Sequence, residues 1–565
     1  MTTPRSYLPK AIRPEMTVRQ IAVDFPASQD VFRTYGEPAG HPGQFGHLEP
    51  LTHFARRKGV ALDKLLSELA AATAAPVDIR SRFAERVHHG FALSALLITL
   101  TLGAGWGAWL LWKIGDGADF GAVPAGHVIA HGEAQLWGFM TLFIMGVSLR
   151  TVLQAVPQSR PGAWVCRGLL MLGWLGVGGS FFWFLSPAAF APLGLVSAAS
   201  LLLLSAAYWV LQLAVLTGKW RVTWARAVLA SGIWLVVWAV VTVGFRRLAG
   251  DEGPGAYSDS QRLLLIELAV FGFAMNSIYG FGQMLLPGLL RLGSTRNWAI
   301  ELAHWLHNTG TIAVCLATGL EWPGTISTAG CALVAAAAIL FAVGHRGFVG
   351  RRRTSQRDEQ GHAPLDFYPP LAFFWLIASL VLMTGGFLYE TATDTPLPHA
   401  FMGAVRHALT VGFMTTLILG VGQRLLPVLD RTVLARPRLV VPILILIAAG
   451  NLLRVGSELA VLAAPAAYAA MPLSALLEWS ALALFAINAA ATMFHTDPLL
   501  SQGHVTPRSS LAVLLAEYPE IEDRLIAAGS QYLERTRSVP SELTIGSFAE
   551  SERHDPAAFV EQLNA

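Results

Sequence analysis

Charged residues are scarce in this chain of 565 residues. Lys, Arg, Asp and Glu together make up 14% of it, against roughly 25% in ordinary soluble domains. The 40 basic and 37 acidic residues nearly cancel to a net charge of +3, which gives no support for nucleic-acid binding. Hydrophobic residues, in contrast, make up 54%. This composition predicts an all-α, multi-pass membrane protein that contacts the lipid bilayer.

Cysteine is almost as scarce as charge. The three cysteines, Cys166, Cys315 and Cys331, lie singly within or beside apolar segments. The chain contains no CxxC motif, so neither a thiolate metal cluster nor covalent attachment of a c-type haem is indicated. We interpret all three cysteines as packing residues.

Long apolar runs organise the middle of the chain. Runs of about 18 residues or more are long enough to span a bilayer as helices. They predict twelve transmembrane helices, near residues 87–113, 123–155, 164–188, 191–217, 224–246, 262–290, 298–320, 324–345, 367–389, 399–428, 439–463 and 470–494. Lys and Arg concentrate in alternate loops, which predicts that these loops and both termini are cytoplasmic. Arg246 is placed among the few basic residues of the outer loops.

The two ends of the chain are polar and resemble each other. Residues 1–85 and 505–565 are predicted to be small helical cytoplasmic modules on either side of a membrane domain at 86–500. The matching segments are 16–36 with 509–529, and 51–69 with 543–563. Both modules resemble DUF1858-type domains, in which a cysteine pair often follows the glycine that ends the first segment. That pair is missing here, so we expect the modules to serve partner binding or self-association.

The membrane part contains an internal repeat. Three stretches align without gaps: GFMTLFIMGVSLR (138–150), GFAMNSIYGFGQMLLP (272–287) and GFMTTLILGVGQRLLP (412–427). They predict three quasi-equivalent arcs of four helices, with the repeated stretch in the second helix of each arc. This arrangement is also found in the main subunit of haem-copper oxidases. One glycine recurs at an equivalent position in each stretch, where a small residue lets helices approach closely: Gly146, Gly280 and Gly420.

Titratable residues occupy one further repeat position. Glu133, Glu267 and His407 are equivalent by the alignment, so the three arcs are predicted to direct them toward a common region. A charged carboxylate at membrane depth costs at least about 2.5 kcal/mol, so such a residue is a functional candidate by default. Glu133 and Glu267 are therefore candidate catalytic residues. Arg262, shortly before Glu267, offers the alternative of a simple ion pair.

Four histidines are predicted to lie in the outer half of the membrane. His127 and His131 are spaced i, i+4 and share one helix face, about 6 Å apart. His399 and His407 enter the equivalent helix of the third arc from the same side. Imidazole is a ligand for haem iron and for copper, and a helical bundle holds cofactors between facing helices. We therefore expect all four to be haem or metal ligands, with headgroup contact as the alternative for His127 and His399.

Two more histidine pairs lie on the predicted inner side. His304 and His307 are spaced i, i+3 and can share one metal. A copper site or a proton path is one interpretation of this pair, and packing polarity is the other. His88 and His89, at the inner edge of the first helix, are interpreted as interfacial.

Three segments carry a resemblance to a known family. HGEAQLWGFMTLFIMGVSLR (131–150), HALTVGFMTTLILGVGQRLLPVLDR (407–431) and GNLLRVGSEL (450–459) resemble segments of the NnrS family. The resemblance implies a twelve-helix protein of the bacterial inner membrane that contains haem and copper and is linked to nitric oxide. By motif position, the family's histidines correspond to His131 and His407. An oxidase-type binuclear centre is not expected, because Glu267 stands where an oxidase has a copper-binding histidine.

The third segment also contains a charged pair. Arg454 and Glu458 are spaced i, i+4 within the eleventh predicted helix. Side chains at this spacing meet on one face of a helix. Arg454 is therefore predicted to neutralise either Glu458 or a haem propionate.

Three functions are compatible with these features. The first is a membrane protein with b-type haem, and with copper as a further metal, that binds nitric oxide or reduces it to nitrous oxide in denitrification or nitrosative-stress defence. Glu133 and Glu267 would then relay protons. The sequence does not identify a docking site for an electron donor. The second is a metal- or proton-coupled transporter, which the predicted unbroken second, sixth and tenth helices disfavour. The third is a membrane sensor that signals through its terminal modules.

Overall fold

The protein is helical throughout the part of the chain that the computed structural model describes. That part comprises residues 27–35, 58–73, 87–117, 119–151, 160–289, 295–345, 363–430, 434–494 and 543–564, with some single residues of the terminal modules. Isolated bridge residues occur there, but no strand does. The all-α class predicted from composition is confirmed.

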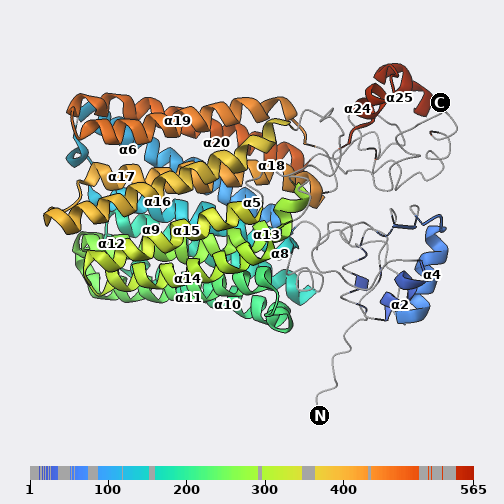
Figure 1. The fold of residues 1–565 in the computed structure, drawn as a ribbon, viewed down its shortest axis with the longest axis horizontal. Helices are drawn as coiled ribbons and strands as arrows, with labels where there is room; N and C mark the ends of the chain where they lie inside the picture. Colours follow the sequence, from blue (N-terminus) through green and yellow to red (C-terminus); the bar gives the residue numbers. More distant parts are fainter. Residues whose placement is uncertain are drawn as a thin grey trace, which may run out of the picture.

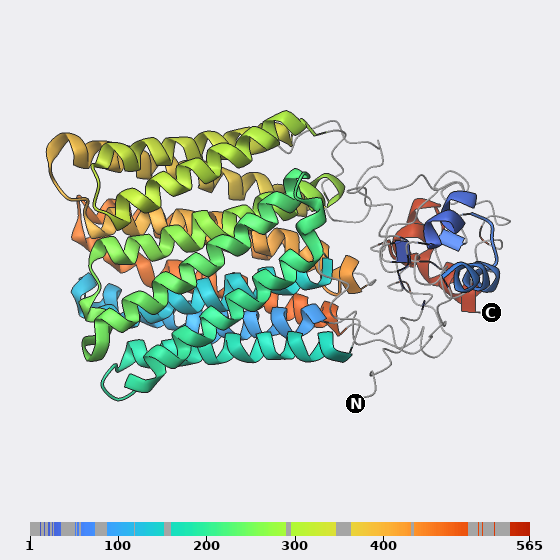
Figure 2. The ribbon, with the colours of Figure 1, turned by 90° about the horizontal axis from the view of Figure 1, so that it is seen from below.

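Twelve long helical segments run side by side to form the bundle (Figures 1 and 2). In chain order they are α5–η3–α6 (Val87–Ile98, Thr99–Gly103, Ala104–Gly117), α7–η5–α8 (Ala125–Glu133, Ala134–Thr141, Leu142–Thr151), α9 (Arg160–Leu185), α10 (Ala191–Leu216), α11 (Thr223–Ala249), α12–η8–α13 (Asp259–Glu267, Leu268–Ala274, Met275–Leu289), α14 (Asn297–Gly319), α15 (Gly324–Gly344), α16 (Tyr368–Thr393), α17–η11–α18 (His399–His407, Ala408–Thr415, Thr416–Asp430), α19 (Val440–Val461) and α20 (Met471–Met493). Short 3₁₀ turns lie between them: η4 (Phe120–Ala122), η6 (Thr217–Lys219), η7 (Gly250–Ala256), η10 (Ala363–Phe367), η12 (Pro437–Leu439) and η13 (Pro465–Ala470).

Ten of these segments, among the described residues, are long and apolar enough to cross a membrane. The two that fall short are α7–η5–α8 and α14, which the sequence also predicts to span. They contain the histidine pairs His127 with His131 and His304 with His307, whose polarity lowers the mean hydropathy of each helix. Large apolar side chains are exposed on other helices, as expected for a surface that faces lipid. Leu203, Leu248 and Leu452 are more than half exposed.

The second helix of each arc is not a regular α-helix. η5, η8 and η11 are π-helical, and each begins at the residue after Glu133, Glu267 or His407. A π-helix has i→i+5 hydrogen bonds and is frequent at functional sites. The helices are continuous, as predicted, but their hydrogen bonding changes at the repeat position that carries the titratable residue.

The repeat glycines lie where helices make close contact. A Cβ atom on Gly146 of α8 would lie 2.7 Å from Phe91 Cβ of α5, and one on Gly280 of α13 would lie 2.9 Å from the Trp224 carbonyl oxygen of α11. Gly420 of α18 meets Tyr368 of α16 in the same way. Each second helix therefore packs its glycine against the first helix of its own arc, which confirms the predicted close approach.

Substitution of Gly280 by Ala is expected to destabilise the bundle by about 1–3 kcal/mol, because the added methyl group meets the Trp224 backbone. Gly178→Ala in α9 is the matched control, since a Cβ there has no neighbour within 4 Å. The unfolding midpoint of the purified protein in detergent measures both variants. Equal midpoints for the two would contradict the close contact.

The three arcs close into a ring. α10 packs on α11 and α15 packs on α16, which joins the first arc to the second and the second to the third. The third arc returns to the first through α20 and α6. At that junction Trp479 Nε1 donates to the Leu100 carbonyl oxygen at 3.1 Å, and Gly115 lies against Pro472.

The terminal modules lie beyond one end of the bundle, which we call the module end; the opposite end is the far end (Figures 1 and 2). α2 (Ser28–Thr34) and α4 (Leu62–Thr73) belong to the first module, and α24 (Ile545–Ser551) and α25 (Pro556–Asn564) to the second. The aligned residues Phe54 and Phe548 are both fully buried. Most of 16–26 and 509–529, and the basic loops at 346–362 and 431–433, lie outside the described residues.

Candidate functional site

His131 has one ring nitrogen anchored and the other without a partner. Its Nδ1 lies 3.0 Å from the carbonyl oxygen of Gly103, the last residue of the π-helix η3. A Cβ on Gly107 would lie 2.5 Å from His131 Cε1, so α6 needs glycine there to accommodate the ring. No hydrogen bond to Nε2 occurs within the described residues.

His407 is anchored in a similar way from the third arc. Its Nδ1 lies 2.9 Å from the Gly403 carbonyl oxygen and 3.1 Å from Glu458 Oε2. The side chain is 22% exposed, and its Nε2 has no hydrogen-bond partner in the described part of the chain. Gly403 provides the space for Glu458, because a Cβ there would lie 2.5 Å from Oε1.

A buried polar cluster lies beside these two histidines, which we call the arginine cluster: Asn451, Arg454, Glu458 and Glu478. Arg454 Nη2 pairs with Glu458 Oε1 at 2.9 Å, as the i, i+4 spacing predicts. Arg454 Nε and Nη1, both amide atoms of Asn451, and Glu478 Oε1 have no partner among the described residues although they are buried. His131 interacts electrostatically with both His407 and Arg454. The cluster contacts His407 through Glu458 and lies within electrostatic range of His131.

His127 and His399 lie nearer the far end, among aromatic rings. The His127 ring centroid is 5.6 Å from that of Trp106 and 6.0 Å from that of Trp109, and its Nδ1 is buried without a partner in the described chain. The His399 ring lies 3.9 Å from that of Phe120. The contacts of these histidines differ from those of His131 and His407, because neither has a ring nitrogen anchored on a backbone carbonyl.

Glu133 is held in a buried ion pair. Its Oε2 lies 3.2 Å from Arg246 Nη2, and the side chains are 9% and 0% exposed. Arg246 also donates to Ser197 Oγ at 2.5 Å and lies over the rings of Trp183 and Phe184. The prediction that Arg246 belongs to an outer loop is wrong: α11 continues to Ala249 and buries it.

Glu267 is buried without a charged partner within the described chain. Its Oε1 accepts from Thr318 Oγ1 at 3.1 Å, and its Oε2 has no partner. Arg262 pairs instead with Asp259 at 3.3 Å, so the interpretation of Glu267 as an ion-pair partner of Arg262 is wrong. The i, i+3 geometry in the first turn of α12 directs Arg262 to the helix start.

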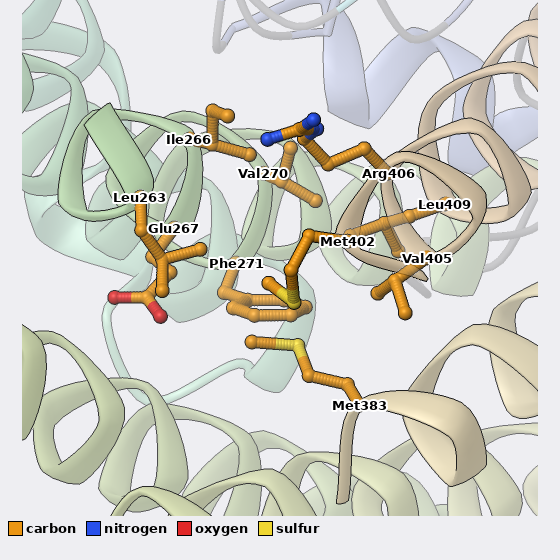
Figure 3. A pocket seen from close by; sticks show the side chains of 10 residues that line it. All are labelled: Leu263, Ile266, Glu267, Val270, Phe271, Met383, Met402, Val405, Arg406 and Leu409. Carbon is orange, nitrogen blue, oxygen red and sulfur yellow. The ribbon is translucent and has the colours of Figure 1, made fainter. Parts of the chain in front are cut away.

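A small apolar pocket borders Glu267 (Figure 3). It lies between the second helix of the second arc and the first two helices of the third arc. The sulfur atoms of Met383 and Met402 and the ring of Phe271 face its interior, and Arg406 lies at its edge (Figure 3). The remaining lining is aliphatic.

His304 and His307 belong to a hydrogen-bond network of the second arc. His307 Nε2 lies 2.7 Å from the Phe271 carbonyl oxygen in the π-helix η8, and His304 lies beside Asn308. Asn308 in turn bonds Asn276 and Trp234. The structure does not bring this pair to His131; it places His307 where it supports the π-helix that follows Glu267.

His88 and His89 form a cluster that sequence reasoning missed. They are 1% and 7% exposed, so the interfacial interpretation is wrong. Both lie against Asp430, at the end of α18, where the chain reaches the module end. Burial favours a higher pKa for the Asp430 carboxyl, but the two imidazoles outweigh it and hold the pKa below its usual range. No sequence pattern indicated this neighbourhood, because α5 and α18 belong to different arcs.

Comparisons with protein-family models and with curated proteins find no match to this chain.

Proposed function

We propose that this protein binds haem between the first and third arcs and uses it to bind nitric oxide or to reduce two molecules of it to nitrous oxide and water, with two protons and with two electrons from an external donor. The observation that carries the proposal is the matched state of His131 and His407. Each has Nδ1 anchored on a backbone carbonyl, and each Nε2 is without a hydrogen-bond partner in the described chain. Histidines that ligate metals commonly hold their second nitrogen in this way.

Two residues of the arginine cluster, Arg454 and Asn451, offer donors to the acidic edge of a porphyrin. Arg454 has two buried guanidinium nitrogens without a described partner, and Asn451 adds an unpaired amide. A buried donor left without an acceptor costs roughly 1–3 kcal/mol, and more when it is charged. Propionate oxygens would satisfy these donors. His131 and His407 are the residues that would hold the iron, and nitric oxide would bind the iron in place of one of the two imidazoles.

The pocket beside Glu267 suits a small neutral gas. Nitric oxide partitions into lipid, so an apolar pocket within the bundle serves it without a polar channel. Glu267 is the better placed of the two candidate catalytic carboxylates to receive or deliver a proton, because its Oε2 has no partner in the described chain whereas Arg246 engages Glu133. Copper accepts nitrogen and thioether donors, which His304 and His307 offer at one place and the pocket methionines at another.

The setting proposed for this activity is the bacterial inner membrane, with both termini in the cytoplasm, as the basic loops and the NnrS resemblance indicate. The module end would then be the cytoplasmic end, and the histidines His127, His131, His399 and His407 would lie toward the periplasm. The terminal modules are proposed to bind a protein partner or a second copy.

The visible spectrum tests this proposal. Protein purified from haem-sufficient cells is expected to show a Soret band that shifts on addition of nitric oxide. The double variant His131→Ala/His407→Ala is expected to lose the band, because both proposed ligands are removed.

His345→Ala is the matched control, since it removes a fully buried histidine of the second arc that has no part in the proposed site. It is expected to keep the Soret band. Wild-type protein without haem, or a double variant at positions 131 and 407 with an unchanged spectrum, would refute the proposal.

A further inference from the structure

Three ligand-type side chains meet at the module end of the bundle. His89 Nε2 lies 2.7 Å from Asp430 Oδ1, and His88 Nε2 lies 3.1 Å from the same oxygen. The potential ligand atoms of the three residues all lie within 4.8 Å of one another. They come from the start of α5 and the end of α18, two helices of different arcs.

The hydrogen bonding of this cluster is incomplete. His88 is 1% exposed, yet neither of its ring nitrogens makes a hydrogen bond within the described chain. The 3.1 Å approach of Nε2 to Asp430 lacks hydrogen-bond geometry. Asp430 Oδ2 is also buried without a described partner. Buried polar atoms are satisfied in the great majority of cases, so the unpaired atoms of this cluster are available to a ligand.

We propose that His88, His89 and Asp430 bind a divalent transition-metal ion of the Zn²⁺ type, independently of the haem site. Two imidazoles and one carboxylate are a common zinc ligand set, with water in the fourth position. Tetrahedral ligands about 2.0–2.2 Å from zinc lie roughly 3.3–3.6 Å apart. The 2.7 and 3.1 Å separations therefore need to widen by only a few tenths of an ångström to a little under 1 Å.

The ion would join the first helix of the membrane domain to the tenth. Arg150 of the second helix donates to the Leu429 carbonyl oxygen at 3.2 Å, so the same junction already connects three helices. A metal bond here constrains the end of α5 that leads back to the N-terminal module. The ion would thus bridge two arcs, with its fourth position left to water.

Metal binding to the full-length protein in detergent tests the proposal. After treatment with a chelator, the protein is titrated with Zn²⁺ in competition with a chromophoric chelator, and bound metal is counted by elemental analysis. The expected result is one tightly bound Zn²⁺ per chain. Asp430→Ala and His89→Ala are each expected to weaken that binding at least tenfold and to leave the Soret band of the haem unchanged.

His345→Ala is the matched control, since His345 is also fully buried but its Nδ1 bonds the Phe341 carbonyl oxygen. It is expected to bind Zn²⁺ as the wild type does. Wild-type binding that is absent, or that survives both ligand variants, overturns the proposal. If the variants do not fold, Co²⁺ added to the wild type decides: intense visible bands of four-coordinate cobalt support the site, and their absence overturns it.

Discussion

Substitution of Arg246 by Leu is expected to lower the free energy of unfolding by about 3–5 kcal/mol, because it leaves the Glu133 carboxylate buried without its partner. The two side chains are 0% and 9% exposed and lie 3.2 Å apart. The loss of the hydrogen bond to Ser197 adds to the effect. Reversible unfolding of the purified protein in mixed micelles, followed by tryptophan fluorescence, measures the change.

The double variant Glu133→Leu/Arg246→Leu separates the ion pair from its surroundings. Removal of both charges of a buried pair is often neutral or stabilising, whereas removal of one is costly. The double variant is therefore expected to be more stable than either single variant. The coupling energy between the two positions is expected to be about 0.5–3 kcal/mol. Additive losses would show that Glu133 and Arg246 are not coupled.

Glu458→Ala is expected to have the second large effect, since one carboxylate serves two partners. It accepts from Arg454 at 2.9 Å and lies 3.1 Å from His407 Nδ1. Its removal leaves Arg454 without its ion-pair partner in the described chain, at a cost of about 3–5 kcal/mol. It also releases the His407 ring, and loss of such a supporting group typically lowers metal affinity by about 10–100-fold. Unfolding and haem content measure the two effects separately.

Two controls accompany this prediction. Glu458→Gln keeps a hydrogen-bonding oxygen for His407 and is expected to retain more haem than Glu458→Ala. Glu301→Ala removes a carboxylate that pairs with Arg226 but is 41% exposed, so its cost is expected to be about 0.2–1 kcal/mol. Equal losses for Glu301→Ala and Glu458→Ala would contradict the role assigned to burial.

Features that follow from the repeat, from helical spacing or from composition were predictable. The gapless repeat placed Gly146, Gly280 and Gly420 at one equivalent position. It predicted helix contacts there, because small residues let helices approach closely. The Arg454–Glu458 pair followed from i, i+4 spacing alone. The fold class followed from composition, since a chain this apolar can satisfy its backbone in lipid only through helices or a closed barrel.

Features that depend on the closed ring were not predictable. The partner of Glu133 is Arg246, more than a hundred residues away, and a single sequence does not identify such a contact. The burial of His88 required knowing that the end of α18 returns to the start of α5. The π-helices also escaped prediction, because their extra residue is stabilised by neighbours such as His307, which bonds a carbonyl oxygen of η8.

The hydrogen bond between Trp479 and Leu100 joins the last helix of the bundle to the first, so it forms late during synthesis. The two residues are 379 positions apart, so at about 5–20 residues per second the donor emerges roughly 20–75 s after its acceptor. During that interval the Leu100 carbonyl oxygen lacks the donor that Trp479 later provides. α20 is the last of the described bundle helices to be synthesised. The contact between the third arc and the first therefore forms only after the other bundle helices have been made.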